Sequence, residues 1–235
     1  MLREAAEQQL EAYLNRQRKN RPQVILKLAV SADGMIGRKG EGQVAITGPH
    51  ARAQSHVLRS ESDAILVGIG TVLADDPELT CRLPGLEDRS PLRVVLDRRL
   101  DMPLASKLVR TARKGRPLLI VAAPGADRQR KSALEAAVAE VLDSTDIASL
   151  LAELAQRGIS ALIVEGGAGV ARSFLAQKAV DRIVLFSSPV VVGEGGVASP
   201  VTEHTVPGGF RLRSEERLGD DRMGDYILED SKIEH

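Results

Sequence analysis

The stretch Ala161-Leu-Ile-Val-Glu-Gly-Gly-Ala-Gly-Val170 decides the fold that the sequence predicts. A short apolar run comes first, a glycine turn follows Glu165, and a helix-like run extends to Leu175. This order of strand, glycine turn and helix is typical of an α/β sheet, where ligands bind beyond the carboxyl ends of the strands. Glycines tolerate positive φ and let a ligand approach closely, and a helix N-terminus suits a phosphate. A tight turn without a ligand explains the stretch equally well.

A second stretch repeats this order. The apolar run 64–67 leads into Gly68-Ile-Gly-Thr71 and a short helix, which Pro77 is expected to end. Two glycine turns after strands indicate an elongated ligand with separated anionic groups, such as a dinucleotide. The pattern from Gly167 is G-x-G-x-x-R, which lacks the third glycine of the dinucleotide fingerprint, and no Walker motif is present.

Apolar and alternating runs predict the rest of the fold. We expect strands at 24–30, 92–96, 117–121 and 181–186, helices at 2–16, 47–61, 127–140 and 147–157, and a short strand at 138–142. A hairpin is expected over 210–228, loops at 38–42 and 193–209, and a frayed end at 230–235. Thr47 is the candidate helix cap. The pattern predicts one α/β domain over 21–235, with a mainly parallel sheet, helices on both faces and an antiparallel hairpin, after an amphipathic helix or connector over 1–20.

Composition excludes several classes of protein. Basic and acidic residues number 32 each, which argues against broad electrostatic binding to nucleic acid or to an anionic membrane. A single cysteine, Cys81, indicates a reducing compartment, and no apolar run approaches the roughly 20 residues of a membrane span. No signal-peptide pattern is present, so a cytoplasmic location is expected. No zinc-ligand spacing and no G-x-S-x-G hydrolase motif occur, so neither a metal site nor a hydrolase triad is expected.

Charged residues at strands and turns leave alternatives open. Lys27 lies inside an apolar strand, so its side chain either snorkels outward or faces a polar cavity. The pair Asp75-Asp76 could bind a metal, act in catalysis or be solvated. Arg98 and Arg99 follow a strand, where they could meet a phosphate or lie on a solvated turn.

An ordered series of motifs runs from residue 21 to about 228. In chain order they are Lys27-x-Ala-x-Ser-x-Asp-Gly34, Ile46-Thr-Gly-Pro-x-Ala-Arg52, Leu58-Arg59, Gly70-Thr-Val-Leu-Ala-Asp-Asp-Pro-x-Leu-Thr80, Arg82, Arg93-Val-Val-Leu-Asp97 and Val164-Glu-Gly-Gly-Ala-Gly169. The series resembles the reductase domain of the bifunctional deaminase-reductase family of riboflavin biosynthesis. Its most specific blocks are 71–79 and 164–169. The H-x-E and P-C-x-x-C motifs of the deaminase half are absent, so deamination is not expected of this chain.

The resemblance implies a dihydrofolate-reductase-like fold, a homodimer and a small-molecule substrate. It implies NADPH-dependent reduction of a ribosylaminopyrimidine 5′-phosphate to its ribitylamino form, with roles carried over by position. Lys27 and Glu165 would face the ribose and assist proton transfer, and Asp75 would lie where nicotinamide and sugar meet. Substrate contacts would come from Gln43, Arg59, Leu79, Arg82 and Glu165, with the arginines on the phosphate. Cofactor contacts would come from Ala29, Thr71, Asp75, Arg98, Gly166, Gly167, Ala168, Gly169, Val170 and Ala171, with Arg98 favouring the 2′-phosphate.

One run departs from the family pattern. The family has a Glu-Ser-Gln-Trp-Ile-Thr-like run, and here it reads Gly42-Gln-Val-Ala-Ile-Thr47, beside the implied substrate. A related reductase of another pterin-like or carbonyl substrate therefore stays open. So does a non-catalytic nucleotide-binding partner of a deaminase, although the joint presence of Lys27, Asp75 and Glu165 argues against it.

Overall fold

The computed structural model describes residues 2–42, 44–137 and 139–229. Its helices are α1 (Leu2–Lys19), α2 (Pro49–Ser60), α3 (Ile69–Asp75), the 3₁₀ turn η1 (Glu87–Arg89), α4 (Lys107–Ala112), α5 (Arg128–Ala136), α6 (Ile147–Gln156) and α7 (Ala168–Ala176). Its strands are β1 (Gln23–Val30), β2 (Met35–Arg38), β3 (Ala64–Gly68), β4 (Leu92–Leu96), β5 (Leu118–Ala122), β6 (Glu140–Asp143), β7 (Ala161–Val164), β8 (Arg182–Ser187), β9 (Gly196–Ala198), β10 (Phe210–Leu218) and β11 (Asp221–Leu228).

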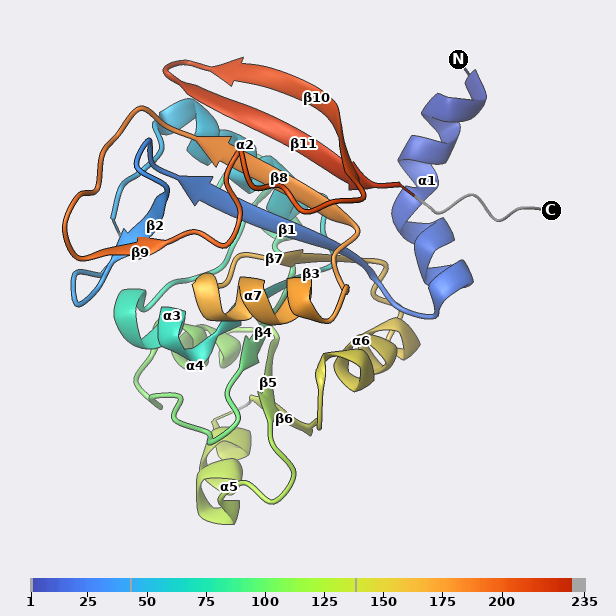
Figure 1. Ribbon diagram of the computed structural model, residues 1–235. Coiled ribbons are helices and arrows are strands. Elements are labelled where there is room, and N and C mark those ends of the chain that lie inside the picture. Colours follow the sequence, from blue (N-terminus) through green and yellow to red (C-terminus); the bar gives the residue numbers. More distant parts are fainter. Residues whose placement is uncertain (1, 43, 138, 230–235) are drawn as a thin grey trace.

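One nine-stranded sheet organises the chain, in the order β10-β11-β8-β1-β7-β3-β4-β5-β6 (Figure 1). The strands from β8 to β6 run parallel to their neighbours, whereas β11 pairs antiparallel with β8 and β10 antiparallel with β11. The prediction of a mainly parallel α/β sheet with a C-terminal antiparallel hairpin is therefore confirmed.

Both faces of the sheet are covered by helices, as predicted. Alternate residues of a strand point to opposite faces, and in β1 Val24 and Leu26 pack in one apolar cluster while Ile25 packs in the other. The cluster around Ile25 receives side chains of α2, α4 and α5, and the cluster around Leu26 receives those of α6 and α7. Continuous apolar runs in the central strands reflect this burial on both sides.

Three local predictions were wrong, and three elements had no prediction. The segment 193–209, predicted as a loop, holds β9; β2 was not predicted and overlaps the predicted loop 38–42 only at Arg38. The two strands pair antiparallel and form a second, two-stranded sheet. The helix predicted over 127–140 ends at Ala136, and β6 takes the chain from Glu140. The helix α4 and the turn η1 had no prediction at all. Gly48 rather than Thr47 is the N-cap of α2, and the buried Asp221 carboxylate accepts a hydrogen bond from the Gly48 N–H at 2.7 Å.

The N-terminal helix α1 is tied to the sheet by ion pairs. Lys19 and Arg21 both contact the Asp181 carboxylate, at 2.9 and 2.6 Å, and Glu11 contacts Arg213 at 3.1 Å. The division into a connector over 1–20 and a domain over 21–235 stays a prediction. Within the described ranges, no helix combines the length and the apolar character needed to cross a membrane. The frayed end predicted at 230–235 lies outside the described residues.

Candidate active site

A cleft of about 860 Å³ lies where β1, β7 and β3 give way to loops and helices. Its walls come from α2, α3 and the start of α7, and from β2 and the neighbouring β9 on the far side. This position, at the carboxyl ends of parallel strands, is where open α/β sheets bind ligands. In Figure 1 the same ends face the space between α3, α7 and the β2–β9 pair.

The sheet register brings Lys27 and Glu165 together. Leu26 of β1 pairs with Val164 of β7. Lys27 directly follows Leu26 and Glu165 directly follows Val164, so the two residues come next to each other at the end of this pairing. The side chain of Lys27 lines the cleft, with its Nζ 5.3 Å from the centre of the Phe186 ring. Of the two orientations left open for Lys27, the structure therefore has the cavity-facing one.

Arg59 of α2 holds Glu165 by two hydrogen bonds. The Arg59 Nε donates to Oε1 and its Nη2 to Oε2, both at 2.7 Å, and both side chains are largely buried. The Arg59 Nη1 donates to the carbonyl of Thr80 at 3.1 Å. A bidentate guanidinium–carboxylate pair is a strong and geometrically fixed interaction.

Burial and neighbouring charges set the protonation states. Burial would raise the pKa of Glu165, but the Arg59 guanidinium, helped by Lys27, outweighs it and holds the pKa at about 2. Burial lowers the pKa of Lys27, and the Glu165 carboxylate partly restores it. Glu165 is therefore ionised at neutral pH. A carboxylate in this state is not a proton donor, so Glu165 does not fit the donor half of the proton-transfer role expected of it.

The two adjacent acids at the C-terminal end of α3 have separate environments. Asp75 lines the cleft, and burial raises its pKa. The Asp76 carboxylate instead accepts a hydrogen bond from the N–H of Lys107, the first residue of α4, at 2.7 Å. In the described ranges, no group of three or more His, Cys, Asp or Glu side chains is placed to hold a metal ion.

The glycine turn after β7 has two kinds of glycine. A Cβ on Gly166 would lie 2.6 Å from the Cβ of Val170, and a Cβ on Gly68 would lie 2.8 Å from Cγ2 of Val170, so both glycines are required by packing. Gly167, the N-cap of α7, and Gly169 are exposed and line the cleft. None of these four glycines has a positive φ, so packing and open access, rather than a left-handed backbone, explain them.

Most of the other expected site residues also line the cleft. Ala29, Thr71 and Arg82 do so, together with residues 166–170. Leu79 and Ala171 do not, because their side chains are buried in the two apolar clusters, and Arg98 is exposed elsewhere. Gln43 lies outside the described residues.

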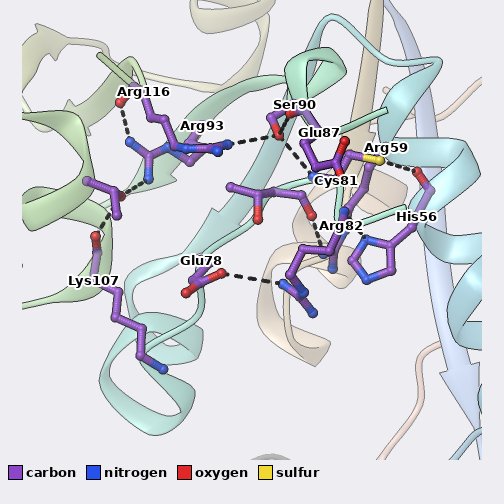
Figure 2. A network of polar contacts seen from close by, with 12 residues as sticks. His56, Arg59, Glu78, Cys81, Arg82, Glu87, Ser90, Arg93, Lys107 and Arg116 are labelled. Carbon is purple, nitrogen blue, oxygen red and sulfur yellow. Dashed lines mark hydrogen bonds and ion pairs between the residues drawn. The ribbon is translucent and has the colours of Figure 1, made fainter. Parts of the chain in front are cut away.

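The sequence predicted a role for Arg59 of α2 but not for its neighbours Arg52, Ser55 and His56 on the same helix. His56 lies beside Arg59 and Arg82 (Figure 2), and its Nδ1 accepts a hydrogen bond from the backbone N–H of Arg82 at 3.3 Å. Arg52, Ser55, His56 and Arg59 all line the cleft. Their spacing of three and four residues marks one helix face, which is the signal that would have found them. Arg38 of β2 and Arg172 of α7 also line the cleft.

A cleft at the carboxyl ends of a parallel sheet, lined by Lys27, Glu165 and the N-terminus of α7, is the ligand-binding position of an α/β protein. Residues 22–222 match the family of the RibD C-terminal domain. The chain belongs to that family.

Two curated relatives illustrate the range of this family. The riboflavin biosynthesis protein RibD of Aquifex aeolicus is 32% identical over 203 residues, which cover 86% of this chain and 56% of that protein. The chain therefore spans little more than half of this longer relative. A 2,5-diamino-6-ribosylamino-4(3H)-pyrimidinone 5′-phosphate reductase of Archaeoglobus fulgidus is 31% identical over 210 residues, which cover 85% of this chain and 95% of that protein.

A solved structure supports the same relationship. The deaminase/5-amino-6-(5-phosphoribosylamino)uracil reductase of Thermotoga maritima aligns with a TM-score of 0.81 at 28% identity, over 97% of this chain and 62% of that one. Relatives of this chain are thus named as reductases of riboflavin biosynthesis.

Proposed function

We propose that this protein reduces a ribosylaminopyrimidine 5′-phosphate to its ribitylamino form with NADPH, a step of riboflavin biosynthesis. The observation that carries the proposal is that Lys27, Asp75 and Glu165 line the same cleft as the N-terminus of α7. That cleft, of about 860 Å³, is lined both by the first turn of α7 and by titratable side chains. The names of the relatives supply the class of substrate.

The reaction needs a proton and a hydride. The bond between C1′ and O4′ of the ribose ring breaks, O4′ takes a proton, and the amine nitrogen lone pair forms a C1′=N double bond. A nicotinamide cofactor, when bound, supplies the hydride that C1′ accepts. Lys27 is the proposed donor of the proton to O4′, because its ammonium lies beside the ionised Glu165, which favours the charged form.

Glu165 would serve this step through charge and position. Its carboxylate stays ionised and is held by Arg59, so it keeps a negative charge next to Lys27. Asp75 has a raised pKa and lines the same cleft, which makes it the second candidate for moving a proton. Proton transfer by a positioned side chain contributes about 10²- to 10⁴-fold to a rate.

The residues at the start of α7 fit a dinucleotide phosphate. Gly167, Ala168 and Gly169 form the first turn, where backbone N–H groups have no intrahelical partner and the helix dipole favours an anion. The position of a Cβ on Gly169 has no atom within 4 Å, so the backbone there is open to approach. Thr71 and Ala29 line the cleft nearby and would contact the cofactor.

The run that departs from the family pattern favours a second candidate function. Val44, Ala45 and Ile46 line the cleft with aliphatic side chains where relatives are expected to place an aromatic one. A reductase of the same fold that acts on another pterin-like or carbonyl substrate fits this wall as well.

Turnover with a defined substrate tests the proposal. Purified protein is incubated with NADPH and the ribosylaminopyrimidine 5′-phosphate, in its deaminated and its aminated form, and loss of NADPH absorbance is followed. We expect turnover with one of them, and its loss in Lys27→Met and Glu165→Gln. Lys131→Met, which removes a surface pair with Asp143, is the control and should retain activity. NADPH binding without turnover favours the second candidate, and no dinucleotide binding leaves a non-catalytic role.

Cofactor choice and assembly are further parts of the proposal. Arg98 would favour the 2′-phosphate of NADPH from outside the cleft wall, so Arg98→Ala should narrow the preference for NADPH over NADH. An unchanged ratio would reject that role. We also propose a cytoplasmic homodimer, which light scattering of the purified protein and fractionation of cells would test.

A further inference from the structure

His56 is a cleft residue to which neither the motifs nor the comparisons assign a role. We propose that its Nε2–H donates a hydrogen bond to the 5′-phosphate of the substrate, beside Arg82. This inference rests on the proposed function, because it needs a substrate that carries a phosphate.

The hydrogen bond at Nδ1 sets the tautomer of His56. A neutral imidazole has one donor and one acceptor nitrogen, and Nδ1 accepts from the backbone N–H of Arg82 at 3.3 Å. The proton then resides on Nε2. His56 lines the cleft and is held by α2 on one side and by the chain at Arg82 on the other (Figure 2). The ring is therefore a fixed donor in the wall.

The charges around His56 keep it neutral. Burial lowers its pKa, and the guanidinium groups of Arg59 and Arg82 lower it further, while Glu165 and the Thr80 carbonyl oppose them. A neutral ring donates one hydrogen bond without adding a third positive charge to this wall. It can therefore stay in place before an anion arrives.

The commitments of Arg59 leave room for this role. Three of its nitrogens already donate, two to Glu165 and one to the Thr80 carbonyl, so its guanidinium faces the carboxylate. The Arg82 side chain is 55% exposed and lies 3.9 Å from Glu78, a long contact that an incoming phosphate can replace. Arg82 supplies charge but little rigidity, and His56 supplies the fixed donor.

Two variants of similar size test the Nδ1 and the Nε2 of His56 separately. In His56→Asn the amide oxygen can still accept from Arg82, but nothing reaches the position of Nε2. In His56→Gln the longer amide carries an N–H donor to that position. Both variants must show the melting temperature and the NADPH affinity of the parent within error before they are compared.

Steady-state kinetics with the phosphorylated substrate and its dephosphorylated counterpart give the first test. A hydrogen bond to a charged group is worth enough for about a 10- to 100-fold rise in KM on its loss. We expect that rise in His56→Asn for the phosphorylated substrate alone, with kcat within about threefold of the parent. His56→Gln should recover most of the affinity. An equal rise for both substrates, or none, overturns the proposal.

Calorimetric titration with ribose 5-phosphate and with ribose gives a second test that does not depend on turnover. The parent should bind the phosphate ester more tightly than the sugar, and His56→Asn should lose that difference. If the parent binds ribose 5-phosphate but turns over neither pyrimidine, the proposed reaction fails and the role of His56 in phosphate binding survives. If His56→Asn binds ribose 5-phosphate as the parent does, the role of His56 is wrong, whatever the reaction.

Discussion

Arg59 and Glu165 stand 106 positions apart in the sequence and meet through two hydrogen bonds of 2.7 Å. The pair joins α2 to the end of β7, where the Glu165 N–H also donates to the Leu66 carbonyl of β3 at 3.0 Å. It fixes the helix that forms one wall of the cleft to the centre of the sheet. It also places an ionised carboxylate beside Lys27. One contact therefore supports both the fold and the proposed chemistry.

Glu165→Gln should destabilise the protein strongly. The variant leaves the Arg59 guanidinium in a largely buried site without its counter-charge, and breaking a buried pair in this way costs about 3–5 kcal/mol. We expect a loss of that order in the free energy of unfolding from urea titration. Glu153→Gln is the control, since the Glu153–Arg157 pair is more exposed and should contribute less than about 1 kcal/mol.

A double variant tests whether the loss comes from the pair itself. Apolar replacement of both members of a buried ion pair is often neutral. Arg59→Met combined with Glu165→Leu should therefore cost much less than the sum of the single changes. Additive losses would show that the two side chains stabilise the protein independently.

The same pair predicts a loss of stability in acid. The pKa of Glu165 is depressed from its ordinary 4.5 to about 2 in the folded protein. The unfolded state therefore binds the proton more tightly, so this contribution is complete above pH 4.5 and is lost as the pH falls toward 2. We expect the difference in unfolding free energy between the parent and Glu165→Gln to narrow over that window. Both proteins carry the same other carboxylates, so the contributions of those groups cancel in this difference. A difference in unfolding free energy that stays constant with pH would contradict the assigned pKa.

The fold was largely predictable because its central elements carry local signals. The strands β1, β3, β4 and β7 are mainly apolar runs, and each is bounded by a turn or a polar segment. The β2–β9 pair was missed because its stability depends on a contact between Met35 and Ala198, which no local pattern reveals. The predicted helix 127–140 extends beyond the observed end of α5 because apolar residues continue past Ala136 into β6.

The site was predictable only in part, through the family motifs. They named Lys27, Asp75 and Glu165, which the structure brings to one cleft. They could not give the partner of Glu165, because the contact with Arg59 depends on how α2 packs on the sheet. His56 was not predicted because its contacts also depend on how α2 packs. Its spacing of three residues from Arg59 does place the two side chains on one face of the helix.

Phe186 should tune the proton donor proposed here. Its ring lies 5.3 Å from the Lys27 Nζ, and such a contact stabilises the ammonium by about 0.5–2 kcal/mol. Phe186→Leu should therefore lower the pKa of Lys27 further. We expect the alkaline limb of the kcat–pH profile to move down by up to about one pH unit.

A second buried phenylalanine provides the control for this shift. Phe174 is also fully buried but packs in the cluster on the opposite face of the sheet. Phe174→Leu should cost a comparable amount of stability and leave the alkaline limb in place. Equal shifts in both variants would mean that loosened packing, and not the ring beside Lys27, moves the limb.

Gly166→Ala should destabilise the fold through one neighbour. The added methyl group would lie 2.6 Å from the Cβ of Val170, and overpacking of this kind costs about 1–3 kcal/mol. Val170→Gly in the same chain removes that Cβ and should restore part of the loss, which a double-variant cycle by thermal unfolding would measure. A loss in Gly166→Ala that Val170→Gly leaves unchanged would point to the backbone instead of the packing.

Gly169→Ala should instead separate stability from cofactor binding. The added methyl group meets no atom within 4 Å, and the φ of Gly169 is not positive, so the helix should be unaffected or more stable by up to about 1 kcal/mol. Gly169 also lies in the first turn of α7, where a pyrophosphate would approach the backbone N–H groups. The methyl group would obstruct that approach, so the Kd for NADPH from fluorescence titration should rise about tenfold or more, a change of about 1.4 kcal/mol.

Gly115→Ala is not a suitable control because its φ is 81° and the change would strain the backbone. Gly70, which has open space around its Cβ position and no positive φ, lines the same cleft from α3. Unchanged NADPH affinity in Gly169→Ala, with weakened affinity in Gly70→Ala, would move the phosphate site from α7 to α3.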